Sequence, residues 1–390
     1  MLINIFGTLD TAVKFLLNNP DLNVNVFIDG VISEESKIDF PFTSYKVLPF
    51  NNAENDLKKC YTVVATSDST YFKIKKRLED VYGLKEFEDF EPCSTFRKKV
   101  VICYGNCYFL MLSKHLNSYR EFISNYGIYP ITGVYHLLGN NDFEIKFPKT
   151  AFDRCCVFIY QHVSKEVNKT IIGAISSDEA LRKLPKSCNK ICIPNFVSQP
   201  NFLFPQNFDD NCSININKFC LFFKKDKFIE SHWQTQSIDK IAYEIKTENF
   251  FDLSEIKKNF DSFISKIEYL DTRWDVPVVE FIKLNYRKEK LFFEEKHPTQ
   301  NFMKYIGDKI VEYILNTKIC KLIQINYDEF VIDTLEQPIY HSTKIALKLE
   351  FEESKYLRQN STFKLSNNKV DLREYVKQYL LWFHPQFFKK

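Results

Sequence analysis

The chain has 390 residues, 45% of them hydrophobic and 26% charged, a composition typical of a soluble globular protein with more than one domain. Lys and Arg total 53 against 50 Asp and Glu, so the charge balance gives no electrostatic case for a nucleic-acid partner. Only nine glycines are present, and neither a dinucleotide fingerprint nor a P-loop motif occurs among them.

The beginning of the sequence and its cysteines predict a cellular compartment. MLINIFGTLD does not have the basic and apolar regions of a signal peptide, and no apolar run approaches the roughly 20 residues that cross a bilayer. Eleven cysteines without scaffold spacing fit a reducing compartment, so we expect a cytoplasmic protein with no integral membrane segment. The cysteine spacings do not match a zinc site, and we expect no metal.

Residues 1–93 alternate between strand and helix patterns. We expect strands at 2–7, 23–29 and 61–67, and helices at 11–19 and 69–83. Strands separated by helices favour a parallel sheet, which predicts a Rossmann-like N-terminal module. The module is expected to end at the acidic, proline-containing segment near residue 93.

A second α/β unit is expected from Lys98 onward. A strand at 98–104 precedes a turn and a continuous helix at 108–126. The later patterns predict strands at 154–161, 190–195, 321–327 and 344–353, and helices at 254–270, 276–291, 299–315 and 372–383. The expected architecture is therefore a larger α/β domain with helical insertions over 98–320, followed by a small β-rich part over 321–390.

Gly105, Asn106 and Cys107 fall where a predicted strand meets a predicted helix. Open α/β folds bind ligands at this edge of the sheet, and a helix N-terminus favours a thiolate over a thiol. Asn106 and nearby backbone N–H groups could stabilise an oxyanion. A cysteine that only packs at a strand–helix turn is the alternative interpretation.

His297 is the second candidate. Pro298 follows it, and proline suits the first turn of the strongly amphipathic helix that we expect at 299–315. Glu294, three residues earlier, could orient the imidazole as the acid of a nucleophile–base–acid set does. A capping or surface histidine is the alternative here.

The site motifs and the first module each resemble those of a known class of protein. A strand-end Gly-x-nucleophile followed late in the chain by acidic-x-x-His resembles the SGNH-type esterases and acyltransferases, with Gly-Asn-Cys in place of Gly-Asp-Ser and Glu294 in place of Asp. The first module resembles the N-terminal module of bacterial sugar O-acyltransferases, which usually begins with Gly-x-Gly. Here Thr8 and Leu9 follow Gly7, so nucleotide binding and a purely structural role both stay open.

Residues 98–320 most closely resemble the WcbI-type polysaccharide biosynthesis acetyltransferases. The resemblance is carried by ICYGNC (102–107), FIYQHV (158–163), IPNFVSQPNFLFP (193–205) and the long block 275–315. Tyr108 stands after the cysteine, where the family often has glutamine.

The resemblance implies a bacterial acetyltransferase that takes its acyl group from acetyl-coenzyme A. It would act on a sugar hydroxyl in capsular or other surface polysaccharide biosynthesis. Cys107 would be the nucleophile or line the thioester site, and His297, oriented by Glu294, would be the general base. The implied oxyanion or substrate residues are Gly105, Asn106, Gln161 and Asn195. The implied ligands of the coenzyme A phosphates are Arg273, Arg287, Lys288 and Lys290.

Two other functions remain open at this point. An SGNH-like esterase or deacetylase would use the same site to remove acyl groups. In a non-catalytic glycan-assembly protein, Cys107 and His297 would not converge. Fold-level analogy does not choose among these functions, because such folds host many chemistries. The expected partner is a sugar or glycan acceptor, with peripheral association with a polysaccharide assembly complex.

Overall fold

The computed structural model describes residues 2–31, 34–40, 43–134, 137, 142–166, 174–195, 202–206, 225–293, 297–325, 336–352, 356–359, 365–384 and 387. The chain divides into two compact units. The first unit comprises Met1–Cys192 and Val311–Asn326, and the second comprises Ile193–Ile310 and Tyr327–Lys390. This grouping differs from the expected ranges 1–93, 98–320 and 321–390, which stay predictions of domain organisation.

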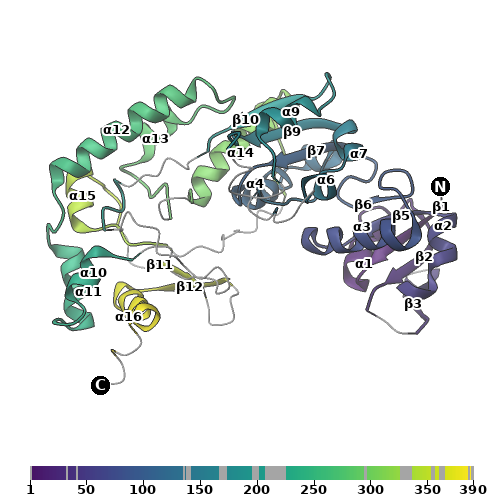
Figure 1. Cartoon of the computed structure of the whole chain (residues 1–390), viewed down its shortest axis with the longest axis horizontal. Helices are drawn as coiled ribbons and strands as arrows, with labels where there is room; N and C mark the ends of the chain where they lie inside the picture. Colours follow the sequence, from purple (N-terminus) through teal and green to yellow (C-terminus); the bar gives the residue numbers. More distant parts are fainter. Residues whose placement is uncertain are drawn as a thin grey trace. The chain divides into compact units, whose positions relative to one another are not determined.

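The first unit begins with a six-stranded sheet in the order β3-β4-β2-β1-β5-β6 (Figure 1). Its strands are β1 (Leu2–Gly7), β2 (Asn23–Asp29), β3 (Ser36–Phe40), β4 (Thr43–Pro49), β5 (Tyr61–Ala65) and β6 (Phe90–Pro92). Its helices are α1 (Leu9–Leu17), α2 (Glu54–Lys59) and α3 (Asp68–Tyr82), with a short 3-10 helix at Phe50–Asn52. All strand pairs are parallel except β3 with β4. The parallel module that the sequence predicts is confirmed, whereas β3, β4, β6 and α2 were not expected.

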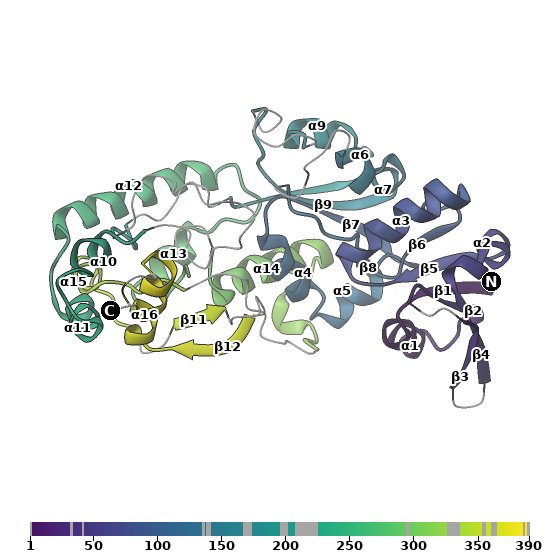
Figure 2. The ribbon, with the colours of Figure 1, turned by 60° about the horizontal axis from the view of Figure 1, so that its bottom comes forward.

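The second sheet of this unit is parallel and has the order β10-β9-β7-β8. Its strands are β7 (Lys99–Tyr104), β8 (Tyr126–Ile128), β9 (Cys155–Gln161) and β10 (Asn189–Ile193). Its helices are α4 (Tyr108–Leu116), α5 (Arg120–Asn125), α6 (Asp142–Lys146), α7 (Lys149–Asp153) and α9 (Ser177–Arg182). Figure 2 shows β7 and β9 side by side, and β7 carries the Gly-Asn-Cys turn at its end.

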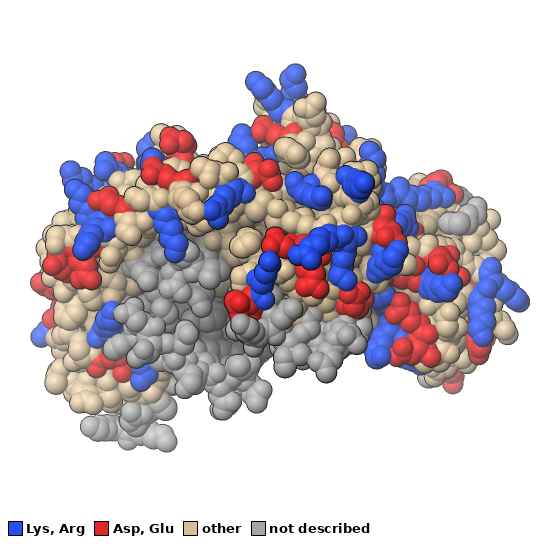
Figure 3. Space-filling view, turned by 45° about the horizontal axis from the view of Figure 1, so that its top comes forward, with Lys and Arg blue, Asp and Glu red and all other residues tan. Residues whose placement is uncertain are grey.

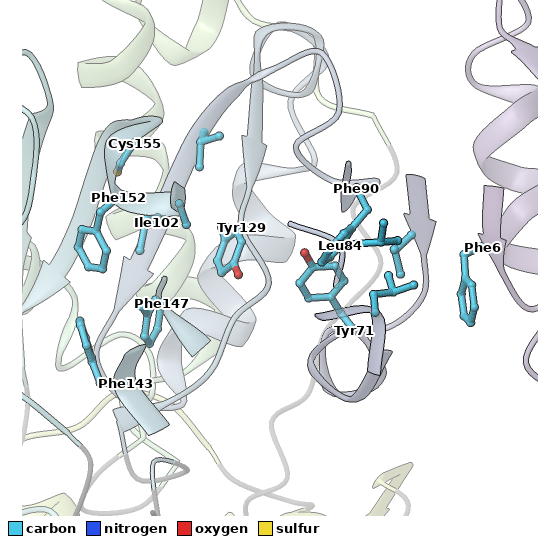
Figure 4. Packing of buried hydrophobic residues seen from close by; sticks show 14 of the residues in the cluster. Phe6, Tyr71, Leu84, Phe90, Ile102, Tyr129, Phe143, Phe147, Phe152 and Cys155 are labelled. Carbon is cyan, nitrogen blue, oxygen red and sulfur yellow. The ribbon is translucent and has the colours of Figure 1, made fainter. Parts of the chain in front are cut away.

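One apolar cluster extends from the first sheet to the second. It includes Phe6 and Tyr71 of the first module and Ile102 and Phe147 of the second, all buried (Figure 4). A polar group lies within the same region, where Glu86 accepts hydrogen bonds from the hydroxyls of Tyr71 and Tyr129. The segment near residue 93 therefore joins two sheets that share a core.

The second unit is mainly helical. Its helices are α10 (Lys227–His232), α11 (Ile238–Thr247), α12 (Leu253–Asp271), α13 (Val279–Asn285), α15 (His341–Leu347) and α16 (Leu372–Phe383). The strands β11 (Tyr356–Gln359) and β12 (Leu365–Val370) form an antiparallel pair. The helix α14 (Gln300–Leu315) runs from the range of this unit into that of the first, where a 3-10 helix follows at Ile319–Lys321. Buried residues of α10, α11 and α16 pack around Tyr340.

Four predicted elements differ from the structure. The helix expected over 108–126 is interrupted, because the backbone at Ser118 and Arg120 pairs with Ile325 and Ile323 instead of continuing the helix. The strand expected at 344–353 is wrong, since α15 occupies its beginning and ends at the left-handed Lys348 (φ 53°).

The helix expected at 276–291 forms only over 279–285, and the strand expected at 321–327 is reduced to a single bridge at Gln324 within the described residues.

Candidate functional site

The turn between β7 and α4 places Cys107 at the carboxyl edge of the second sheet. Cys107 is the N-cap residue of α4 and its side chain is partly exposed. The carbonyl of Gly105 accepts a hydrogen bond of 2.7 Å from the N–H of Val134, which lies on the connection that follows β8. The turn is therefore held from both ends, by its strand and by a neighbouring loop.

Gln161 and Asn106, two of the residues predicted for the site, are brought together here. Gln161 is the last residue of β9, which pairs with β7, and its Oε1 accepts a 2.9 Å hydrogen bond from the N–H of Asn106. The Oδ1 of Asn106 in turn accepts from the N–H of Tyr108 at 3.1 Å. Both side chains are buried, so these bonds are shielded from competing water. Their visible role is to fix the backbone on either side of Cys107.

Gly105 is required by the closeness of its neighbours. A Cβ atom at this position would lie 2.4 Å from the ring of Phe109 and 2.5 Å from Oε1 of Gln161. Both neighbours are 1% exposed, so neither can move aside without disturbing the core. The glycine allows the turn to approach α4 and β9 closely.

The same edge carries a polar pair that the sequence analysis did not single out. His162 follows Gln161 and is exposed, and its Nδ1 lies 3.5 Å from Oγ of Ser177 at the start of α9. The N–H of Ser177 also donates to the carbonyl of Val163 at 3.0 Å, which fixes α9 to the end of β9. His162 directly follows Gln161, a predicted strand-end residue, and this position was the signal that could have identified it.

His297 lies in the range of the second unit. Its carbonyl accepts from the N–H of Phe293 at 2.8 Å, and Pro298 forms an antiparallel bridge with Phe292. The helix α14 begins only at Gln300, so the prediction that Pro298 occupies the first turn of that helix is wrong. His297 is partly buried, and Glu294 lies outside the described residues. Cys107 and His297 belong to different units.

Asn195 and the predicted phosphate ligands also fall in the range of the second unit. Asn195 follows the end of β10 by two residues and is partly buried. Arg273 and Arg287 are exposed, and each guanidinium donates to a tyrosine hydroxyl, that of Tyr269 and Tyr286 respectively.

The two predicted lysine ligands differ in their surroundings. Lys288 is exposed. Lys290 forms a nearly buried ion pair with Glu336 at 3.1 Å and donates to the carbonyl of Gln337. Its ammonium is thus already neutralised within the fold.

Several general properties of the surface bear on function. Figure 3 shows Lys and Arg interspersed with Asp and Glu on the face drawn, in keeping with the nearly balanced charge. Among the described residues, no three His, Cys, Asp or Glu side chains gather as a metal site would require. In that same part of the chain, no helix combines the length and apolar character needed to cross a membrane.

Comparison with known proteins identifies a family. Residues 100–315, more than half of the chain, match the family described as "Polysaccharide biosynthesis enzyme WcbI". A solved structure of WcbI, described as a novel polysaccharide biosynthesis enzyme, matches with a TM-score of 0.52 and 18% identity, covering 75% of this chain and 91% of that one. That structure is of the native protein without a disulfide bond between coenzyme A and one of its cysteines. No protein of curated function matches the chain.

Proposed function

Because the chain belongs to the WcbI family of polysaccharide biosynthesis enzymes, we propose that it is a coenzyme A-dependent O-acyltransferase that acetylates a sugar hydroxyl of a surface polysaccharide. The observation that carries this proposal is the position of Cys107. It is the N-cap residue of α4 at the carboxyl edge of a parallel sheet, on a turn held by Gln161 and Val134. The description of the WcbI structure, which names coenzyme A together with a cysteine, supports the same ligand.

The proposed chemistry has two steps. The thiolate of Cys107 attacks the thioester carbonyl of acetyl-coenzyme A, and the C–S bond to coenzyme A breaks as its thiolate leaves. The sugar hydroxyl then attacks the acetyl-cysteine, gives its proton to His297 and releases the Cys107 thiolate. In this proposal Glu294 orients His297, and Asn195 donates a hydrogen bond to the oxyanion.

Direct transfer from the thioester to the sugar, with Cys107 only lining the thioester site, is the other form of the same reaction. Trapping of an acetylated Cys107 separates the two forms.

The remaining roles follow from charge and burial. Arg273, Arg287 and Lys288 are exposed cations, and the proposal assigns them to the coenzyme A phosphates. Lys290 is left out of this set because Glu336 already neutralises it. The proposal places the reaction in the cytoplasm, with a glycan acceptor as the partner and peripheral association with a polysaccharide assembly complex.

The test is calorimetric titration of the full chain with coenzyme A and acetyl-coenzyme A, beside Cys107→Ala and His297→Ala. Incubation with coenzyme A disulfide follows, with intact-mass detection of a mixed disulfide. We expect saturable binding by the wild type, one coenzyme A adduct that is lost in Cys107→Ala, and turnover that is lost in His297→Ala. Cys320→Ala is the matched control, since Cys320 is an exposed cysteine of the 3-10 helix at Ile319–Lys321.

Three outcomes would contradict the proposal. A folded wild type that binds neither coenzyme A nor acetyl-coenzyme A would remove the cofactor assignment. Acyl release from acetylated glycans without any need for coenzyme A would instead identify the esterase alternative. Retention of the adduct in Cys107→Ala, with its loss in Cys320→Ala, would move the site away from the β7–α4 turn.

A further inference from the structure

A pocket of about 430 Å³ opens at the amino ends of the strands of the second sheet. Its polar walls come from the residues that precede or begin β7, β8 and β9. These residues are Arg97, Lys98, Lys99, Ser124, Asn125 and Arg154. The volume falls in the range of small-molecule sites and exceeds what a single water or ion fills.

The pocket has an excess of positive charge. Four of its lining residues are cations, and among the described residues that line it none is acidic. Arg97 is paired with Asp21 at 2.9 Å, and Arg154 lies 3.6 Å from Glu91. For Lys98 and Lys99, the described part of the chain offers no carboxylate within ion-pair distance, so about two positive charges remain uncompensated.

The surroundings of these cations hold them in place. The Lys99 ammonium lies 5.5 Å from the ring centroid of Tyr126, and the Arg154 guanidinium lies 4.5 Å from that of Phe87. Lys98 is half-buried, and this burial lowers the pKa of its ammonium below the ordinary value for lysine. A bound anion would oppose that effect by favouring the charged form. The pocket is therefore set up to gain from a negatively charged ligand.

This pocket is separate from the Cys107 turn. Lys99 begins β7 and Cys107 follows its end, so the six residues of the strand place the two about 20 Å apart. An anion held at Lys99 cannot be the group that reacts at Cys107.

We propose that this pocket, here named the amino-edge site, binds a diphosphate group. Arginine forks and lysine ammonium groups both bind phosphate oxygens, and a diphosphate concentrates several negative charges in a small volume. The negative charge of a diphosphate matches the uncompensated positive charge of the cations. A single sugar carboxylate would leave part of that positive charge unmatched. The inference does not depend on the acyl-transfer reaction.

The first test is calorimetric titration of the full chain with inorganic diphosphate. We expect saturable binding that weakens at high salt, at least tenfold weaker binding in Lys98→Gln/Lys99→Gln, and a smaller loss in Lys99→Gln. Lys99 is exposed, so the single variant is expected to fold even if the double one does not. Lys149→Gln is the matched control, an exposed lysine of α7 paired with Asp153 outside the pocket. Absence of saturable binding by the wild type, or equal affinity in Lys99→Gln and Lys149→Gln, would overturn the proposal.

A second set of titrations identifies the source of the diphosphate. A nucleoside diphosphate that binds more tightly than inorganic diphosphate, with the same loss in Lys99→Gln, would indicate a nucleotide. Coenzyme A that displaces diphosphate would indicate the cofactor's own phosphates. Cys107→Ala is expected to bind diphosphate as the wild type does, so failure of the acyl-transfer proposal would leave this result intact. Loss of diphosphate binding in Cys107→Ala would refute the separation of the two sites.

Discussion

Replacement of Lys75 by methionine tests how the two sheets of the first unit are held together. Lys75 lies on α3, and its side chain is only 2% exposed. Its ammonium pairs with Glu86 at 3.1 Å and with Glu79 at 2.5 Å. Glu86 also accepts from Tyr71 of α3 and from Tyr129, which follows β8. Lys75→Met would leave the Glu86 carboxylate buried with hydroxyl partners and no cation.

The expected loss can be estimated from burial. Removal of one partner from a buried ion pair costs about 3–5 kcal/mol, because the remaining charge stays out of water. Methionine has a similar length, so the cavity contribution is small. The double variant Lys75→Met/Glu86→Gln removes the charge but keeps an oxygen that accepts from the tyrosines. We therefore expect it to recover most of the loss, to within about 1 kcal/mol of the wild type.

The assay is urea unfolding of the single and double variants at several pH values. Burial raises the pKa of Glu86 above its ordinary value, while Lys75 lowers it. Without Lys75 the native carboxyl holds its proton to higher pH than the unfolded one does, so stability falls as pH rises. The deficit of Lys75→Met should therefore be largest near pH 7–8 and shrink toward pH 5.

Probes for the two units are distinct in this chain. All three tryptophans lie in the range of the second unit, so their fluorescence monitors that unit, while hydrogen exchange of the peptides around Glu86 monitors the first. A single variant that loses less than about 1 kcal/mol, or a double variant that loses as much as the single one, would refute the reasoning. A deficit that grows as pH falls would refute the assigned role of Glu86.

Two further predictions concern the turn and the second unit. Gly105→Ala should cost about 1–3 kcal/mol and slow formation of the coenzyme A adduct, because its Cβ would meet Phe109 and Gln161. Gly30→Ala, whose Cβ would meet only ordinary contacts at 3.7 Å or more, is the control, and equal urea midpoints for the two would contradict the prediction. Burial raises the pKa of Asp226 to about 7, so its contribution to stability should decline as pH rises from about 4 to 7, by up to about 4 kcal/mol. Asp226→Asn should flatten this dependence in urea midpoints measured across that range, whereas Asp252→Asn, at an exposed helix cap, should not.

The elements that sequence predicted well have a strong periodic signal of their own. Continuous apolar runs identified β1, β5 and β7, and amphipathic spacing identified α12, α14 and α16 within about two residues. The failures occur where distant residues decide the conformation. Ser118 and Arg120 leave the predicted helix because Ile323 and Ile325, some 200 residues later, supply other backbone partners. No local pattern in 108–126 contains that information.

The candidate site divides in the same way. The strand-end glycine, the cysteine at the start of a helix and the strand-end Gln161 could all be located from the period of the strands, and the structure joins Gln161 to Asn106 at 2.9 Å. The function of that contact could not be foreseen, because a glutamine amide can donate to a ligand or accept from the backbone with equal chemical ease. Tertiary geometry selects the second role for Oε1. The amino-edge cations illustrate the opposite case. The sequence placed phosphate ligands at 273–290, near His297, whereas Lys98 and Arg154 line one pocket because β7 and β9 are neighbours. Charge clusters of this kind depend on strand order, and strand order is the property that the sequence pattern leaves open.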